Sequence, residues 1–487
     1  MKRLSQLLSD IEIQEIIGNA DPEVTSIVTD SRKMTGGAMF VALRGVNVDS
    51  HRFIHAVADA GAVAIVCEEL PARLESTVTY IRVSNTAVAL GYIASAWNGE
   101  PSSRLTLVGV TGTNGKTTTA TLLYEMARLR GLRAGLISTV CNYIDDKAVE
   151  ADHTTPDPLT INSLLADMVD AGCTHAFMEV SSHAAHQHRI AGLKFAGGIF
   201  TNLTRDHLDY HKTVDAYIKA KKSFFDNLSS TAWALTNDDD RVGQVMLQNT
   251  RARRLTYALQ RDADFRCRII DSRLDGMLLS LNGHEVETMF TGRFNAYNLT
   301  AVFGASMLLW PGDIDRVLVD MSRLVPVSGR FQTLRSTDGR LTAIVDYAHT
   351  PDAIVNVLDT VRNIVGDAHA IITVTGAGGN RDTGKRPIMA AEAARRSDRL
   401  ILTSDNPRDE DPDDIIAQMK AGLDDDGNSK TLAITDRREA IRAAIALAAD
   451  GDVIVVAGKG HETYQEIKGV KHHFDDREVI LQAFGKL

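Results

Sequence analysis

The chain has 487 residues, of which 44% are hydrophobic, and its formal net charge is −10. At ~100–200 residues per domain, this length predicts two to four domains. The negative charge argues against a general nucleic-acid binder, and no run of ~18 apolar residues suggests a membrane span. Residues 1–5 contain no apolar run long enough for a signal peptide. The four cysteines lie far apart and do not have the spacing of metal ligands. We therefore expect a cytoplasmic protein with reduced thiols.

Residues 1–100 read as a small N-terminal α/β domain. Apolar runs within residues 25–32, 38–45, 62–67 and 79–83 are typical of short buried strands separated by turns. Pro101, Ser102 and Ser103 then predict a linker.

A glycine-rich stretch at residues 109–119 opens the second predicted domain, residues 101–328. An apolar strand pattern precedes it and a helical pattern follows, so backbone N–H groups at the helix start would bind a phosphate. Lys116 adds a mobile positive charge, and Thr117 can offer its hydroxyl to Mg²⁺. The strict phosphate-loop pattern fails by one position, because Val110 stands at its first glycine. We still predict nucleotide binding.

Further strands in this domain are expected at residues 134–137, 176–180 and 198–201, alternating with helices in a mostly parallel sheet. Polar motifs follow each strand, at the edge where ligands bind in such sheets. Glu179 ends one strand and is suited to be a Mg²⁺ ligand; the alternative is a surface carboxylate at a strand end, which would give the same pattern. His207 lies in a dense cluster of polar and ionisable residues, 205–211, which favours a functional role over a structural one. Lys219, Lys221 and Lys222 follow on an amphipathic helix that composition identifies only as a basic face.

Residues 329–487 repeat this organisation as a third, Rossmann-like α/β domain. Strands are expected at residues 343–346, 370–374, 400–403 and 453–456, each followed by a polar or glycine-rich signature. The loop at residues 376–386 carries three cations and suits an anion. The turn from Asp405 to Arg408 places both charge signs around a proline, which suits an amino acid; a helix-capping turn is the alternative.

Together these motifs resemble the Mur ligase family of peptidoglycan synthesis. The resemblance rests on residues 112–117, 178–183, 201–209, 295–298 and 346–352, and it covers essentially the whole chain. It implies an α/β fold of three domains, with a UDP-binding N-terminal domain, a central ATP-binding domain and a C-terminal domain that binds an amino acid. The turn at 405–408 is similar to that of members that add meso-2,6-diaminopimelate.

The resemblance also implies a set of site residues. The ATP contacts would be Gly112, Thr113, Asn114, Gly115, Lys116, Thr117, Thr118, Asn295, Asn298, Arg330 and Asp346. The catalytic residues would be Lys116, Glu179, His207 and Lys221, and Thr117, Glu179, His207 and a carbamylated Lys221 would hold Mg²⁺, with two ions expected. The UDP-muramoyl-dipeptide contacts would be Thr29, Ser31, Val46, Asn47, Val48, His153, Thr154, Thr155, Ser181, Gln187 and Arg189. The diaminopimelate contacts would be Arg381, Asp405, Asn406, Pro407, Arg408, Gly458 and Glu462.

The implied reaction is ATP-dependent amide formation through an acyl phosphate on the D-glutamyl residue of UDP-N-acetylmuramoyl-L-alanyl-D-glutamate. Expected partners are these small molecules alone, with no nucleic acid, and the chain is expected to be a monomer. Three alternatives stay open: the same ligation with L-lysine, a folylpolyglutamate-type ligase, and a P-loop NTPase without ligase activity. Two positions depart from the family pattern, since Val46 to Val48 lack a frequent histidine and His153 replaces a common asparagine.

Overall fold

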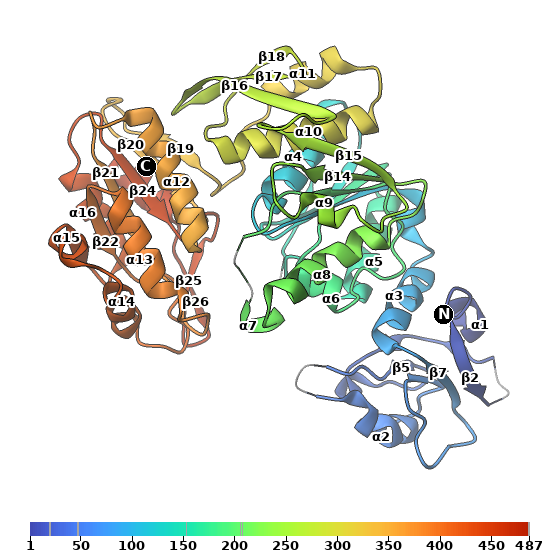
Figure 1. The fold of residues 1–487 in the computed structure, drawn as a ribbon. Coiled ribbons are helices and arrows are strands. Elements are labelled where there is room, and N and C mark those ends of the chain that lie inside the picture. Colours follow the sequence, from blue (N-terminus) through green and yellow to red (C-terminus); the bar gives the residue numbers. More distant parts are fainter. Residues whose placement is uncertain (19–20, 46–47, 152, 205, 207, 486–487) are drawn as a thin grey trace.

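The computed structural model describes residues 1–18, 21–45, 48–151, 153–204, 206 and 208–485. Its elements form three parts along the chain, each built on its own principal sheet (Figure 1). The N-terminal part, in blue, lies at one end of the molecule, and the C-terminal part, in orange and red, lies beside the central part. The expected α/β class with three domains is confirmed.

The N-terminal part contains a five-stranded sheet in the order β2-β7-β6-β5-β4, parallel except for β2. Its strands are β2 (Ile13–Ile17), β4 (Ile27–Val28), β5 (Met39–Val41), β6 (Ala64–Cys67) and β7 (Thr79–Val83). The remaining elements are β1 (Lys2–Arg3), β3 (Glu23–Val24), α1 (Leu4–Leu7), α2 (Ile54–Asp59) and α3 (Thr86–Trp97). The strand expected within residues 25–32 is short, because Asp30 caps a 3₁₀ turn at Ser31–Lys33. The predicted linker is itself a 3₁₀ turn, Pro101–Arg104.

The central part is built on an eleven-stranded sheet in the order β11-β10-β9-β12-β8-β13-β14-β15-β16-β17-β18. Its strands are β8 (Thr106–Thr111), β9 (Ala134–Ile137), β10 (Asn142–Ile144), β11 (Lys147–Val149), β12 (His175–Glu179), β13 (Gly197–Phe200), β14 (Trp233–Asn237), β15 (Arg253–Ala258), β16 (Phe265–Arg273), β17 (Gly276–Leu281) and β18 (His284–Thr288). The run from β9 to β16 is parallel, as predicted, and both edges are antiparallel.

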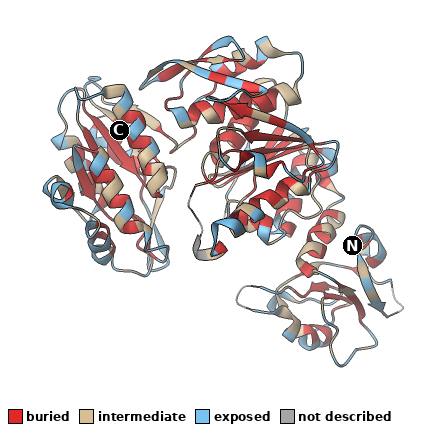
Figure 2. Ribbon diagram, viewed as in Figure 1, coloured by how far each residue is buried: buried red, intermediate tan, exposed pale blue. Residues whose placement is uncertain are grey.

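Helices cover both faces of the central sheet. They are α4 (Lys116–Leu129), α5 (Pro158–Asp170), α6 (Ser182–His186), α7 (Leu208–His211), α8 (Val214–Asp226), α9 (Gly243–Met246), α10 (Arg293–Leu309) and α11 (Ile314–Ser322). Strand β8 contributes Val108 and Val110 to the core under α4 and α10, and Leu107 to the core under α5 and α8. The strand is therefore buried on both faces, which explains its continuous apolar run. Figure 2 shows buried residues, in red, gathered in the interior of the central part.

The C-terminal part has a six-stranded sheet in the order β19-β20-β24-β21-β22-β23, antiparallel only at β19. Its strands are β19 (Gln332–Arg335), β20 (Thr342–Asp346), β21 (Ile371–Thr375), β22 (Arg399–Leu402), β23 (Thr431–Ala433) and β24 (Val453–Ala457). A separate hairpin consists of β25 (Tyr464–Ile467) and β26 (Val470–His473). The helices are α12 (Pro351–Val365), α13 (Lys385–Arg396), α14 (Pro412–Lys420), α15 (Asp425–Ser429), α16 (Arg437–Leu447) and α17 (Asp476–Ala483).

All four strands predicted in the C-terminal part are present within one or two residues of their expected limits. Their carboxyl ends and those of β8, β12 and β13 carry the polar signatures found in the sequence. Within the described residues, no helix combines the length and apolar character that crossing a bilayer requires.

Candidate active site

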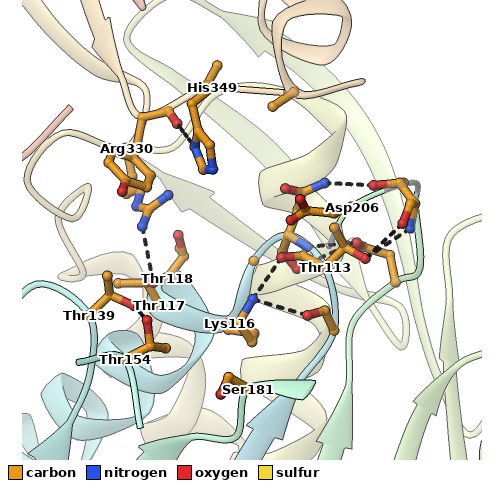
Figure 3. A pocket seen from close by; sticks show the side chains of 18 of the residues that line it. Thr113, Lys116, Thr117, Thr118, Thr139, Thr154, Ser181, Asp206, Arg330 and His349 are labelled. Carbon is orange, nitrogen blue, oxygen red and sulfur yellow. Dashed lines mark hydrogen bonds between the residues drawn. The ribbon is translucent and has the colours of Figure 1, made fainter. Parts of the chain in front are cut away.

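A cavity of about 920 Å³ is lined by residues of both the central and the C-terminal parts. The phosphate loop and the ends of β12 and β13 form its central side. Arg330, His349 and the loops after β21, β22 and β24 form the other side. In Figure 3, Arg330 and His349 reach from the C-terminal part towards Thr117 and Lys116. Parallel strands from two sheets thus present their carboxyl ends to one space.

The phosphate loop runs from β8 into α4, and two glycines determine its path. A Cβ on Gly112 would collide with Thr201 Oγ1, and one on Gly115 would collide with Asn298 Oδ1. Gly115 also has a φ of 85° as the residue before α4. Only glycine fits at either position, and the result is an anion-binding helix N-terminus at the cavity.

The segment after β13 braces this loop. Asn114 N donates to Asn202 Oδ1 at 3.0 Å, and Thr113 N donates to Asn202 O at 2.8 Å. Thr201 Oγ1 donates to Asn114 O at 2.6 Å. The loop is therefore held in position before any nucleotide binds.

Two lysine amines meet at the loop. Lys116 Nζ donates to Gly112 O at 3.1 Å and Thr113 O at 2.8 Å, while Lys221 Nζ donates to Gly112 O at 2.6 Å. Burial and the neighbouring Lys116 charge hold the pKa of Lys221 well below its usual value, although Asp206 opposes them. Burial also lowers the pKa of Lys116. The helix predicted as a solvated basic face instead buries Lys221, which is 1% exposed.

Glu179, at the end of β12, is fully buried beside the loop. Its Oε1 accepts from Thr139 N at 2.7 Å, whereas its Oε2 has no hydrogen-bond partner among the described residues. A buried carboxylate oxygen without a donor is costly, and a divalent cation would satisfy it. No described group of three or more His, Cys, Asp or Glu side chains forms a metal site. Any Mg²⁺ here would therefore need oxygen ligands from a hydroxyl, water or phosphate as well.

The C-terminal part contributes a cation to the loop and a carboxylate to the cavity. Arg330 Nη2 donates to Thr117 Oγ1 at 3.1 Å, and the Arg330 guanidinium lies 4.6 Å from the centre of the Tyr347 ring. Phe331 N donates to Asp346 Oδ2 at 2.6 Å. Burial raises the pKa of Asp346 to about 6, although Arg330 opposes the rise.

The Asp405–Arg408 turn follows β22 and faces the same cavity. Asn406 Nδ2 donates to Glu462 Oε2 at 2.7 Å, and Lys459 Nζ donates to Glu462 Oε2 and Asn406 Oδ1, both at 3.0 Å. A Cβ on Gly458 would lie 2.6 Å from Asp405 Oδ2, so glycine makes room for that carboxylate. Burial works to raise the pKa of Asp405, but Lys459 and Arg437 outweigh it and lower the value.

The remaining wall carries hydroxyls and one guanidinium. Thr139 Oγ1 donates to Thr154 Oγ1 at 3.0 Å, and Thr155 Oγ1 donates to Glu179 O at 2.8 Å. Arg189 Nη1 donates to Thr155 O at 2.7 Å, and its Nε donates to Gln187 Oε1 at 3.0 Å. These contacts join the predicted dipeptide residues to the predicted metal residue.

The cavity brings together most of the predicted site residues. All eleven predicted ATP contacts line it. So do Glu179, Lys221, His153, Thr154, Thr155, Ser181, Arg189, Arg381, Asp405, Asn406, Arg408, Gly458 and Glu462. Gln187 and Pro407 are not part of the lining. Gln187 accepts a hydrogen bond from the lining residue Arg189, and Pro407 lies between the lining residues Asn406 and Arg408.

Other predicted residues lie elsewhere. Thr29, Ser31 and Val48 belong to the N-terminal part, away from this cavity. Val46, Asn47 and His207 lie outside the described residues.

Sequence reasoning missed several lining or supporting residues. Thr139, His349 and Lys385 lie inside motifs already noted at strand ends, so their position after a strand was the available signal. Lys459 lies between the predicted contacts Gly458 and Glu462 in the sequence but is fully buried, with its amine between Asn406 and Glu462. Its role depends on contacts across 53 residues, which local pattern cannot reveal.

Three family models match the chain. The Mur ligase family catalytic domain matches residues 23–98, the Mur ligase middle domain matches residues 110–306, and the Mur ligase glutamate ligase domain matches residues 329–460.

Curated relatives match over nearly the full length. A UDP-N-acetylmuramoyl-L-alanyl-D-glutamate--2,6-diaminopimelate ligase of Bacteroides fragilis is 58% identical over 99% of both chains. One of the same name from Cytophaga hutchinsonii is 53% identical over 100% of this chain and 99% of its own. A solved structure of a ligase with this name is 33% identical, with a TM-score of 0.71 over 99% of both chains. A MurF ligase from Thermotoga maritima in complex with ADP, 18% identical, has a TM-score of 0.60 over 96% of this chain and 99% of its own, which shows a shared fold.

Proposed function

Because the chain belongs to the Mur ligase family, we infer that it is the ATP-dependent ligase that joins meso-2,6-diaminopimelate to UDP-N-acetylmuramoyl-L-alanyl-D-glutamate. The observation that carries this inference is a single cavity lined both by a phosphate loop and by a turn with charges of both signs. In the proposed reaction, this cavity would hold ATP, the carboxylate and the amino acid.

The chemistry follows from the weak electrophilicity of a carboxylate. A carboxylate oxygen of the D-glutamyl residue attacks the γ-phosphorus of ATP, the bond to the β-γ bridging oxygen breaks, and ADP leaves. The amine of diaminopimelate then attacks the acyl carbon, loses a proton, and expels inorganic phosphate. Lys116 and the loop N–H groups would neutralise charge on the transferring oxygens.

We propose that Thr117 Oγ1 and Glu179 Oε2 hold one Mg²⁺, since the latter is a buried oxygen that needs a cation or donor. The ion would supply charge neutralisation for the phosphates. A second ion would lie beside Lys221 and His207. Thr117 is the acceptor of Arg330 in this structure, so metal binding would exchange that contact.

We propose that Lys221 is carbamylated. Its amine is buried and its pKa is well below the usual value, which favours the neutral, nucleophilic form. Attack of Nζ on carbon dioxide with loss of a proton forms an N–C bond and an anion. That anion would be a ligand for Mg²⁺ and would attract the Lys116 ammonium, which a protonated Lys221 would repel.

The remaining assignments are proposals of the same kind. Thr29, Ser31 and Val46 to Val48 would hold the uridine diphosphate, and the wall from Thr154 to Arg189 would hold the muramoyl-dipeptide. Domains are proposed at residues 1–100, 101–328 and 329–487. A monomer in the cytoplasm, where ATP is made, would suffice because the cavity is formed within one chain.

The experiment that tests this function measures phosphate release and amide product from the purified chain. ATP, Mg²⁺ and UDP-N-acetylmuramoyl-L-alanyl-D-glutamate are supplied with meso-diaminopimelate, with L-lysine, or with no amino acid. We expect tripeptide product and phosphate only with diaminopimelate, because lysine leaves the groups for the distal carboxylate unpaired. Phosphate release independent of the amino acid would identify a plain NTPase, and preference for lysine would refute the substrate assignment.

A further inference from the structure

We infer that the β25–β26 hairpin aligns the amino-acid turn for its substrate, and that Glu466 is the positioning residue that orients the Arg408 guanidinium. The inference rests on the proposed function and deepens it, because it concerns how the amino acid is selected. The hairpin is not part of the sequence motif at residues 405–408, because it begins at Tyr464, 56 residues after Arg408.

The hairpin pairs with the turn through its backbone. Arg408 N donates to Glu466 O at 3.0 Å, and Lys468 N donates to Arg408 O at 2.7 Å. These bonds form a parallel bridge between Arg408 and Ile467. Arg408 has a φ of 52°, in the left-handed region that a non-glycine residue adopts only when its surroundings impose it. Strand β25 therefore holds Arg408 in an unusual backbone conformation.

Side chains extend the same contact. Glu466 Oε2 accepts from Arg408 Nε at 3.2 Å, and Gly379 O accepts from Arg408 Nη1 at 2.8 Å. Among the described residues, these contacts use Nε and Nη1 and leave Nη2 for an incoming carboxylate, and Arg408 lines the cavity. Two fixed acceptors at different nitrogens of a planar group determine its orientation.

The hairpin also fixes the amide of Asn406. Glu466 N donates to Asn406 Oδ1 at 2.9 Å, as does Lys459 Nζ at 3.0 Å. With two donors at Oδ1, Asn406 must direct its Nδ2 to Glu462 Oε2. Gln465 Nε2 completes the attachment by donating to Asp405 O at 2.7 Å.

The Glu466 carboxylate is separable from the hairpin's attachment. The attaching bonds to Arg408 and Asn406 come from backbone atoms, and a further one comes from Gln465. The Glu466 side chain itself is 28% exposed, and that of Arg408 is 22% exposed. Removal of the Glu466 carboxylate should therefore leave the fold intact and affect only the contact that it makes with the Arg408 guanidinium.

The test is a double-mutant cycle on the full chain, using Glu466→Ala, Arg408→Ala and the pair. We expect Glu466→Ala to raise the KM for meso-diaminopimelate about fivefold and to lower discrimination against L-lysine, because an unfixed guanidinium must be ordered on binding. The KM values for ATP and the UDP-linked substrate should not change. In the Arg408→Ala background, Glu466→Ala should have little further effect, because its partner is gone.

His472→Ala is the matched control, since His472 is an exposed residue on the second strand of the same hairpin. It should behave as the unchanged protein does. Equal effects of Glu466→Ala in both backgrounds, no effect on the KM for diaminopimelate, or a lowered KM would each overturn the inference. Failure of the unchanged protein to ligate diaminopimelate would instead refute the proposed function, so the two failures are distinguishable.

Discussion

The carbonyl oxygen of Gly112 accepts hydrogen bonds from both Lys116 and Lys221. Two ammonium groups at one buried acceptor repel each other, and burial disfavours the charge on each. The Lys221 amine, whose pKa burial and the Lys116 charge hold well below its usual value, is therefore suited to covalent conversion into an anion.

Replacement of Lys221 tests that conversion. Lys221→Ala should abolish ligation, because the buried carbamate would be lost, and short carboxylates such as formate should restore part of it. Lys222→Ala is the control, since Lys222 lies next on the same helix and pairs with Asp226 at 2.5 Å. It should retain most activity. Labelled bicarbonate should give a carbamate carbon signal in the unchanged protein and in Lys222→Ala, and none in Lys221→Ala.

Full activity of Lys221→Ala, or a carbamate signal that persists in it, would contradict the role. An equal loss of activity in Lys222→Ala would show that activity depends on the integrity of helix α8 and not on the Lys221 amine in particular.

At the residue scale, the sequence predicts groups that lie within a motif and misses groups that act across the fold. Glu179 and Lys116 are recognisable because a strand end or a loop contains them. Lys459 and Glu466 depend on contacts with Asn406 and Arg408, more than 50 residues away. Burial of Lys221 is equally invisible, since a lysine on an amphipathic helix usually faces solvent.

At the scale of elements, the phosphate loop depends on two glycines and on the segment after β13. The path of the loop places Gly115 against Asn298 of α10, so the loop and a predicted ATP contact lie against each other. A Cβ atom at position 115 would displace both the loop and the Asn298 side chain.

Gly115→Ala should therefore impair ATP binding and destabilise the fold by about 1–3 kcal/mol, through strain and contact with Asn298. Gly131→Ala is the matched control, because Gly131 follows the same helix with a φ of 77°, and among the described residues no atom would lie within 4 Å of its added Cβ. It should lose about 1 kcal/mol from the left-handed conformation and bind ATP normally. Calorimetric ATP titration and thermal unfolding measure both effects. Equal ATP affinity in the two variants would contradict this account.

Strands β8, β9, β12 and β13 were predicted because burial on both faces gives continuous apolar runs, whereas the parallel strands β14, β15 and β23 were not predicted. Strands β16 to β18 were not predicted, since β16 has many exposed residues and begins the antiparallel end of the sheet, where β18 is the edge strand. Strand β2 pairs antiparallel at the edge of the N-terminal sheet, and no pattern in the sequence indicated it separately. Edge strands carry less hydrophobic signal than central ones.

At the scale of the whole molecule, the site exists only where two sheets meet. Arg330 crosses from the C-terminal part to Thr117 of the phosphate loop, a contact between residues 213 positions apart. The N-terminal part lies away from this cavity, so a substrate with a nucleotide at one end and a peptide at the other would have to span the distance (Figure 1). Under the proposed function, the three parts would divide the binding of one long substrate, ATP and an amino acid.

The central claim is that ATP activates the D-glutamyl carboxylate as an acyl phosphate. Oxygen-18 in that carboxylate tests it most directly, with mass analysis of the phosphate released during ligation of meso-diaminopimelate. We predict that each phosphate carries one labelled oxygen, because the C–O bond breaks when the amine attacks. Phosphate without label, or with an oxygen derived from water, would contradict the account.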